Sequence, residues 1–393
     1  MENVYKRKIF EAKECNNIKE IIYNSAELYA DNVAFVIKNK EKDKVSYTNI
    51  TYKEFLNDIN YLGTAFYSLG LKEKRVAILG KNRYEWALTH LTNMLGNIIS
   101  IPLDKELQLE ELENSLIRSR ADVIVFDSKL IKIIEEIKNR NNVYITNYIC
   151  MDNKEGYECI SNLLNKGKEI LNNGNQNYIN NEINENEMNL LLFTSGTTSK
   201  SKAVMLSHKN IASNIYALQC VEDVRPKDTN IAFLPFHHIF GSTGLIMMLS
   251  KGVRTVFPDG LKYIKQNMME YQVSVFVGVP ALVEAMYKAV QKEIEKQGKT
   301  KLINKMIKLS NFLLKCHIDI RRILFKKVLD SLGGKLRLIV LGGAPADPIS
   351  IQGFYEMGIV NVQGYGLSET SPVVAAENNK ARRFGSVRLS NDK

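Results

Sequence analysis

The chain has 393 residues, of which 53 are Lys or Arg and 43 are Asp or Glu, so its formal net charge is +10. Its length predicts about two to three domain-sized units. With 45% hydrophobic and 24% charged residues, the composition is typical of a globular protein with a large core and excludes a globally disordered chain. Acidic residues are mixed with the basic ones along most of the chain, so the charge does not favour nucleic acid as a partner.

No apolar stretch reaches the ~18 residues of a membrane-spanning helix, and the charged first ten residues do not have the pattern of a secretion signal. The five cysteines are scattered and include no CxxC pair, which predicts reduced thiols rather than disulfides or a zinc site. We therefore expect a cytoplasmic protein, and peripheral membrane contact and self-association stay open.

Strand-like and helix-like segments alternate in the first part of the chain. Apolar runs at 75–80, 98–103 and 122–127 predict strands that are buried on both faces, and the segments at 82–96 and 107–120 have a helical period. Successive βαβ units of this kind predict a largely parallel sheet with helices on both sides.

A polar, Asn-rich stretch at 172–187 predicts a linker or surface loop. After it, apolar runs at 189–196, 231–236, 254–258 and 273–280 alternate with helical segments and predict a second parallel sheet. The expected fold is therefore α/β, with two mainly parallel sheets flanked by helices.

The segment 301–332 is basic and has apolar residues at helical spacing. We expect its apolar stripe to pack on the protein and its lysines to face solvent, with contact to anionic lipid as the alternative. The stripe consists of Ile303, Met306, Ile307, Leu313, Leu314, Ile318, Ile323, Leu324 and Val328.

Small hydroxyl residues and lysines follow the strand that ends near Thr194, in the sequence TSGTTSKSK at 194–202. In such a loop, backbone N–H groups and hydroxyls hold a polyphosphate while a lysine neutralises its charge. The spacing is not the GxxxxGK[ST] pattern, and a solvated turn is the alternative. The loop predicts a nucleotide phosphate site if other motifs support it.

Two later strands end in glycine-rich segments, LIVLGGAPAD at 338–347 and VQGYGLSETSP at 362–372. Ligands of open α/β sheets bind at the carboxyl ends of strands, and glycines there admit a planar ring. Tyr365 offers an aromatic face for a base and Glu369 a carboxylate for Mg²⁺. A tight turn and a surface glutamate are the alternatives.

Two adjacent histidines, His237 and His238, stand in AFLPFHHIFGSTG at 232–244, where a strand ends among aromatic and small residues. Neighbouring side chains point in different directions, so a pocket wall is expected rather than a shared metal. A structural core histidine is the alternative.

Taken in order, FTSGTTSKSKAVMLSH, FLPFHHIFG, LGGAP and QGYGLSETSP resemble the motifs of the adenylate-forming superfamily of acyl-CoA synthetases, luciferases and peptide-synthetase adenylation domains. QGYGLSETSPVV is most similar to bacterial long-chain fatty acid CoA ligases. The resemblance implies that residues 14–393 are the large N-terminal AMP-binding domain, incomplete at its C-terminal end. It also implies ATP, Mg²⁺ and coenzyme A as cofactor and co-substrates.

By position, the resemblance makes Lys202, Glu369 and His238 catalytic and places Mg²⁺ on Thr194 and Glu369. Contacts to ATP and AMP are expected from three segments: Thr194, Ser195, Gly196, Thr197, Thr198 and Lys202; Gly343, Ala344 and Pro345; Gln363, Gly364, Tyr365, Gly366, Leu367 and Ser368. The acyl pocket is expected to be lined by Phe236, His238, Val277, Gly278, Pro280 and Gly366.

The sequence departs from the family pattern in two places. Ser199, Ser201 and Ala203 stand where the family usually has Gly, Pro and Gly. The ribose-binding aspartate, the hinge and the small lid domain with its catalytic lysine are not found after residue 384, which implies slow or no CoA-ester formation by this chain.

The expected reaction is ATP-dependent activation of a carboxylic acid to acyl-AMP and then acyl-CoA. Neither FLPFHHIFG nor VFVGVPALV contains an acid that could pair with an ammonium group, so a medium- or long-chain fatty acid is expected rather than an amino acid. The alternatives are an aryl carboxylate, or a nucleotide- or acyl-binding fragment without turnover.

Overall fold

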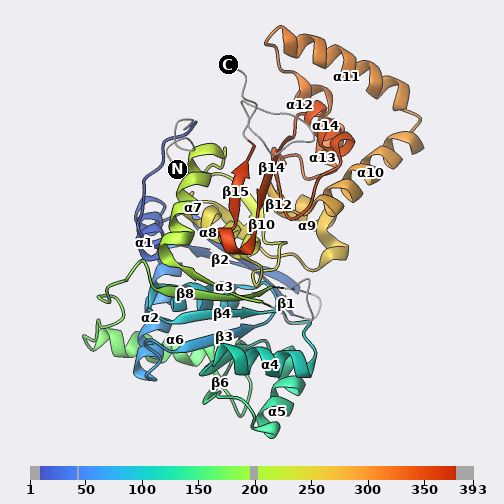
Figure 1. The fold of residues 1–393 in the computed structure, drawn as a ribbon. Helices are drawn as coiled ribbons and strands as arrows, with labels where there is room; N and C mark the ends of the chain where they lie inside the picture. The colour runs from blue at the N-terminus through green and yellow to red at the C-terminus, as the bar shows by residue number, and fades with distance from the viewer. Residues whose placement is uncertain (1–8, 42–43, 195–201, 378–393) are drawn as a thin grey trace.

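The computed structural model describes residues 9–41, 44–194 and 202–377. In Figure 1 these residues form two β-sheets, one above the other, with helices between them and on their outer faces. Among the described residues, none of the helices combines the length and apolar character needed to cross a bilayer.

The first sheet has seven strands in the order β7-β6-β5-β3-β4-β8-β9, and only β9 is antiparallel to its neighbour. Its strands are β3 (Arg75–Leu79), β4 (Ile99–Leu103), β5 (Val123–Phe126), β6 (Asn147–Cys150), β7 (Glu158–Cys159), β8 (Met188–Thr194) and β9 (Lys202–Ser207).

The second sheet has eight strands in the order β15-β14-β13-β12-β10-β11-β1-β2, with β15 and β2 antiparallel to their neighbours. Its strands are β1 (Val33–Glu41), β2 (Lys44–Thr51), β10 (Thr229–Ile231), β11 (Arg254–Val256), β12 (Val275–Gly278), β13 (Leu338–Leu341), β14 (Val360–Gly366) and β15 (Val373–Ala376).

The helices form three layers around the two sheets, as the three apolar cores show. The central layer is α1 (Ile18–Leu28), α2 (Tyr52–Ser68), α3 (Tyr84–Leu95), α7 (His208–Val221) and α8 (Ile239–Ser250), with α6 (Ile160–Asn172) packed on α2. Outside the first sheet lie α4 (Leu109–Ser119) and α5 (Ile131–Arg140). Outside the second lie α9 (Ile264–Tyr271), α10 (Pro280–Lys296), α11 (Thr300–Lys315), α12 (Arg321–Leu324), α13 (Lys326–Asp330) and α14 (Pro348–Glu356).

The continuous apolar character of the strands follows from these layers. In β3, Val76 and Ile78 point into the core between the sheets, whereas Ala77 and Leu79 point into the core under α4 and α5. Successive side chains of a strand alternate between faces, so a strand covered on both faces is apolar at every position. The predicted fold of two mainly parallel, helix-flanked sheets is confirmed.

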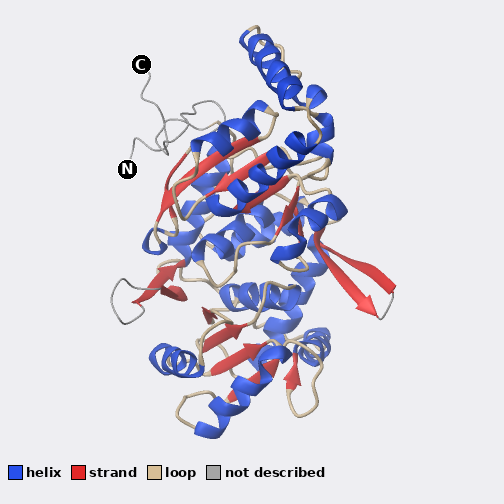
Figure 2. Ribbon diagram, turned by 90° about the vertical axis from the view of Figure 1, so that its right-hand side faces the viewer, coloured by secondary structure: helices blue, strands red, loops and turns tan. Residues whose placement is uncertain are grey.

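The structure differs from the sequence analysis at three places. The strand β8 joins the first sheet beside β4 instead of opening the second one. The hairpin of β1 and β2, which projects from the body in Figure 2, was not predicted. The segment 301–332 is broken into α11, α12 and α13, and its Ile318 and Ile323 are 51% and 76% exposed instead of packed.

The polar stretch after α6 contains no helix or strand from 173 to 187, but it is anchored by Tyr178, which is fully buried. The Tyr178 hydroxyl donates to the carbonyl oxygen of Thr92 at 2.8 Å. Its ring occupies the space that a Cβ at Gly63 or Gly96 would need. Tyr178, with the partly buried Ile179 next to it, therefore anchors a segment that is mostly polar in composition.

Candidate active site

An apolar cavity of about 560 Å³ lies where β12, β13 and β14 end and α8 begins. It gathers residues that sequence analysis had singled out from four separate segments: His238, Val277, Gly343, Gly364, Tyr365, Gly366, Leu367 and Ser368. The carboxyl ends of parallel strands meet at one sheet edge, which explains why segments more than 100 residues apart converge here.

The inner wall of this cavity comes from α7, α8 and the segment between them. Leu218, Val224, Met247 and Met248 supply apolar side chains, and Gly244 leaves space because a Cβ there would meet only Val277, at 4.0 Å. Glu222 also lines the cavity and is buried. The expectation that no acid stands near the acyl pocket therefore holds for the two quoted segments but not for the whole wall.

Backbone geometry explains two glycines at the other end of the cavity. Gly343 has φ +85°, a conformation that residues with a side chain rarely adopt. At Gly366 a Cβ would come within 1.8 Å of the Pro372 carbonyl oxygen. Both positions bring bare backbone to the cavity, where a flat ligand could lie against it.

Several predicted residues lie outside this cavity. Phe236 is buried, with its ring centroid 5.2 Å from that of Trp86. Gln363 is buried between β13 and β15, and its backbone N–H donates to the Glu377 carboxylate at 3.1 Å. Four more are Gly278 at the end of β12, Pro280 at the start of α10, and the exposed pair Ala344 and Pro345 next to Gly343.

The predicted phosphate loop connects β8 to β9. Thr194 and Lys202 are register partners at the end of this hairpin that adjoins the loop, while Ser195, Gly196, Thr197 and Thr198 lie outside the described residues. Strand β9 contacts the short helix η4 (Ser368–Thr370), which carries the exposed Glu369. The hairpin and Glu369 therefore belong to one neighbourhood.

A metal could be held here by oxygen atoms. Thr194 offers a hydroxyl and Glu369 a carboxylate, and the described residues include no group of three or more His, Cys, Asp or Glu placed to bind a metal. Two hard oxygen donors, completed by phosphate oxygens and water, suit Mg²⁺, which usually keeps several waters. The donor set therefore fits a metal that arrives with a nucleotide.

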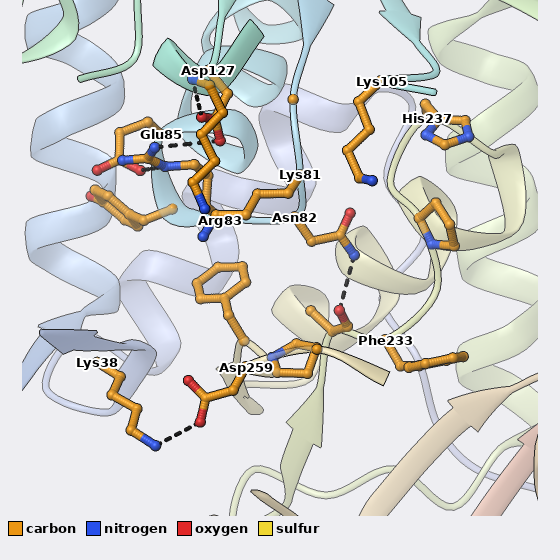
Figure 3. Close-up of a pocket in the computed structure, with 18 of the residues that line it drawn as sticks. Lys38, Lys81, Asn82, Arg83, Glu85, Lys105, Asp127, Phe233, His237 and Asp259 are labelled. Carbon is orange, nitrogen blue, oxygen red and sulfur yellow. Dashed lines mark hydrogen bonds and ion pairs between the residues drawn. The ribbon is translucent and has the colours of Figure 1, made fainter. Parts of the chain in front are cut away.

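A second, polar cavity of about 1040 Å³ follows the carboxyl ends of β3, β4, β5 and β11 (Figure 3). Its wall holds basic and acidic side chains, many of them in pairs. Lys38 Nζ lies 2.7 Å from Asp259 Oδ2, and Arg83 Nη1 lies 2.8 Å from Asp152 Oδ1. Phe233, Pro235 and His238 line both cavities, so the two meet along the segment that leads into α8.

Asn82 positions that shared segment and was missed by sequence analysis. Its side-chain nitrogen donates to the carbonyl oxygens of Ala232 (2.9 Å) and Leu234 (2.6 Å). Its side-chain oxygen accepts from the backbone N–H of Phe236 at 2.9 Å. Figure 3 shows Asn82 reaching from the end of β3 toward Phe233. The sequence signal was its place in the short loop after the apolar strand β3.

The two histidines occupy different surroundings. His237 is mostly buried, and burial, with the nearby His238 ring, lowers its pKa to about 4. Its Nε2 lies 3.6 Å from Asp104 Oδ2. His238 is exposed at the N-cap of α8, with its ring centroid 4.2 Å from that of His237. His237 therefore belongs to the polar wall, and His238 stands at the junction of both cavities.

A profile of AMP-binding enzymes matches residues 22–389, nearly the whole chain. The chain belongs to the AMP-binding enzyme family. This membership confirms the resemblance to adenylate-forming enzymes.

Similar proteins include long-chain-fatty-acid–CoA ligase 5 of Rattus norvegicus, which is 28% identical over 351 residues, 84% of this chain and 51% of the relative. The chloroplastic long-chain-fatty-acid–[acyl-carrier-protein] ligase AEE15 of Arabidopsis thaliana is 23% identical over 433 residues, 96% of this chain and 59% of the relative. The chain thus spans about half the length of the curated relatives that it matches.

Among solved structures, a long-chain-fatty-acid-CoA ligase (FadD1) from Archaeoglobus fulgidus has a TM-score of 0.74 at 17% identity, covering 96% of this chain and 69% of that one. The inhibitor-bound N-terminal domain of FACL13 from Mycobacterium tuberculosis has a TM-score of 0.71 at 19% identity, covering 93% and 79%. At these identities the likeness establishes the fold.

Proposed function

We propose that residues 14–393 form the nucleotide- and acid-binding domain of a ligase that activates a medium- or long-chain fatty acid with ATP and passes it to coenzyme A. The observation that carries the proposal is the apolar cavity, which opens onto the bare backbone of Gly343 and the Tyr365–Ser368 turn. An alkyl chain gains about 0.8 kcal/mol for each buried CH₂, so such a cavity favours long acids. The names of the relatives support the same substrate class.

In the proposed reaction, a carboxylate oxygen attacks the α-phosphorus of ATP, the bond to the bridging oxygen breaks, and pyrophosphate leaves with the electron pair. The thiolate sulfur of coenzyme A, its proton lost to solvent, then attacks the acyl carbonyl and AMP leaves. Adenylation is needed because a free carboxylate has no adequate leaving group. Catalysis of such steps rests mainly on positioning and charge neutralisation.

The chain's own residues have separate tasks in this proposal. Lys202, at the end of the β8–β9 hairpin, neutralises charge on the leaving pyrophosphate, and the residues of the hairpin loop hold the phosphates. Tyr365, which is 54% exposed, provides a ring face for adenine beside Gly343. Thr194 and Glu369 would hold Mg²⁺, which supplies positive charge at the phosphate oxygens when it is bound.

The polar cavity suggests where the thiol enters. It reaches His238 from the side opposite the alkyl chain and exposes Lys81, Lys105 and Lys129 toward solvent. Phosphate groups of a thiol donor could pair with these lysines while the sulfur approaches the acyl carbonyl. Measuring thioester formation with coenzyme A and with a carrier protein decides which of the two is the thiol donor.

Acid-dependent exchange of pyrophosphate into ATP tests the proposal, with palmitate, octanoate, acetate, coumarate and phenylalanine compared. Exchange that is fastest with the fatty acids supports it. ATP binding without exchange would make the chain a binding module, and preference for coumarate would make it an aryl-acid enzyme. CoA-ester formation is measured separately, since slow formation by the 393-residue chain remains a prediction.

A further inference from the structure

Helix α11 projects from the body of the molecule, beyond α10 and α14 (Figure 1). One side of it packs on the protein: Ile303 and Ser310 are buried, and Met306 and Ile307 contact the core under the second sheet. The opposite side is open to solvent, yet three large apolar side chains lie on it. Leu302, Leu309 and Phe312 are 54%, 50% and 64% exposed.

These three side chains form one stripe. At about 100° per residue, positions 302, 309 and 312 fall within an arc of roughly 80° on the side away from 303 and 310. Lys305 falls inside this arc, and Lys301, Lys308 and Lys315 follow on one flank. Helix α11 contains four lysines and no Asp or Glu. Its outer face is therefore both apolar and uniformly cationic.

The neighbouring helix α10 shows what a solvated face looks like in this protein. Its exposed positions carry both signs of charge, with Lys288, Lys292 and Lys296 beside Glu293 and Glu295. No large hydrophobic residue of α10 is exposed. A single exposed leucine is ordinary, but an apolar stripe with lysines only is typical of helices that lie in a membrane interface.

We propose that the outer face of α11 docks on an anionic lipid bilayer, with Leu302, Leu309 and Phe312 inserted among the acyl chains. The lysines supply the charge complementarity, because their aliphatic stems can lie along apolar surface while the ammonium groups reach lipid headgroups. After α11 the chain adds two more exposed apolar residues, Ile318 and Ile323. The proposal does not depend on the proposed ligase activity.

Flotation of the purified chain with vesicles tests this docking. Vesicles of phosphatidylcholine with ~30% phosphatidylglycerol should bind the chain, and vesicles of phosphatidylcholine alone should bind it at least about tenfold more weakly, with salt reducing the difference. Lys305→Gln/Lys308→Gln should lower partition by about 25-fold, since each lysine near an anionic surface contributes about fivefold. Leu309→Ser/Phe312→Ser should lower it at least tenfold.

Two matched controls keep the result specific. Lys288→Gln/Lys292→Gln removes the same charge from α10, and Leu28→Ser/Tyr144→Ser removes one exposed leucine and one exposed aromatic residue elsewhere (70% and 61% exposed). Both should retain wild-type partition within about twofold. Far-UV circular dichroism and thermal melting establish that each variant is folded.

A second measurement does not rely on loss of binding. The only tryptophan, Trp86, is buried, so Phe312→Trp adds an exposed reporter whose emission should shift to the blue with anionic vesicles. The proposal would be overturned if the chain did not bind anionic vesicles, or if the control variants lost as much partition as the α11 variants. It would also be overturned if the emission of Phe312→Trp did not shift when the variant was bound to vesicles. A fall in sedimentation coefficient caused only by the α11 variants would overturn it as well, because a second copy would then cover this face.

Discussion

The apolar cavity is lined by aliphatic side chains and glycines from α7, α8, β12 and β14, whereas the polar cavity is lined by charged residues that follow β3, β4, β5 and β11. The charged wall is held by paired partners: burial would raise the pKa of Asp152, but hydrogen bonds from Ser128 and Arg83 lower it. The apolar wall is stabilised by packing of its side chains, and its glycines leave the space of the cavity open. We therefore expect changes in the polar wall to displace the shared segment 232–241, and changes in the apolar wall to alter which acid fits.

The largest effect is expected in the proposed nucleotide site, at Lys202 on β9 and Glu369 on η4. Lys202→Ala and Glu369→Ala should each slow acid-dependent ATP–pyrophosphate exchange by about 10²- to 10³-fold, because in the proposed reaction Lys202 neutralises the developing negative charge and Glu369 would hold the Mg²⁺ that does the same. Both residues are exposed, so the melting temperature should stay unchanged. Lys209→Ala, which changes an exposed lysine on α7, is the control. A variant that keeps the wild-type rate would exclude its residue from the site.

In the polar wall, we expect Asn82 to stabilise the segment that both cavities share. Asn82→Ala removes hydrogen bonds to Ala232, Leu234 and Phe236 and leaves their backbone groups without this partner. We expect the free energy of unfolding to fall by about 2–3 kcal/mol, measured by urea denaturation. Asn114→Ala, at an exposed position on α4, should change it by less than about 0.5 kcal/mol. Equal effects at both positions would contradict the positioning role.

The apolar wall should set chain length through Gly244. Gly244→Phe fills open space in the cavity, and each methylene that it displaces costs about 0.8 kcal/mol, or about fourfold in binding. Loss of two to three methylenes should shift the preference from palmitate to octanoate by roughly 16- to 60-fold in exchange assays. The octanoate rate of the same variant is the internal control. An unchanged preference would place the alkyl chain elsewhere.

At neutral pH the smallest effect is expected at His237, whose contribution to stability changes only as the pH falls. Its folded pKa of about 4 lies below the value near 6.5 of the unfolded chain, so the unfolded state binds more protons between these values. Its contribution to stability is therefore complete above pH 6.5 and is lost as the pH falls toward 4, by up to about 1.4 kcal/mol per unit. Urea denaturation of His237→Gln should show a correspondingly shallower pH dependence. An unchanged slope would show that folding does not lower the pKa of His237.

Sequence patterns predicted well those parts of the fold that depend on local burial. The strands at 75–79, 99–103 and 123–126 are covered on both faces, so their apolar runs identified them. Which sheet a strand joins depends on contacts between distant segments, and β8 was therefore assigned to the wrong sheet. Strand β9 was missed because its exposed face carries the apolar Met205, so polar and apolar residues do not alternate in its sequence as its buried and exposed positions do.

For the site, three of the four motifs, FLPFHHIFG, LGGAP and QGYGLSETSP, supply residues that line the apolar cavity, since each follows a strand at the same edge of the second sheet. The fourth, FTSGTTSKSKAVMLSH, follows β8 of the first sheet. Asn82, Asp104 and Glu222 could not be found in this way, because each acts through a partner or cavity that another part of the chain supplies. Phe236 was expected in the acyl pocket, but its aromatic ring is used to pack against Trp86. The type of a residue therefore predicts the chemistry of its side chain better than it predicts which cavity or core the side chain faces.

The most direct test of the account is photo-crosslinking of the chain with a palmitate analogue that carries a diazirine at its terminal carbon, followed by peptide mass spectrometry. Our proposal places the alkyl chain in the apolar cavity, so labels should fall on residues 218–224 and 239–248 and should decrease when unlabelled palmitate is added. Labels concentrated at residues 80–85, 104–106 or 127–129 would place the alkyl chain in the polar cavity and would contradict the account.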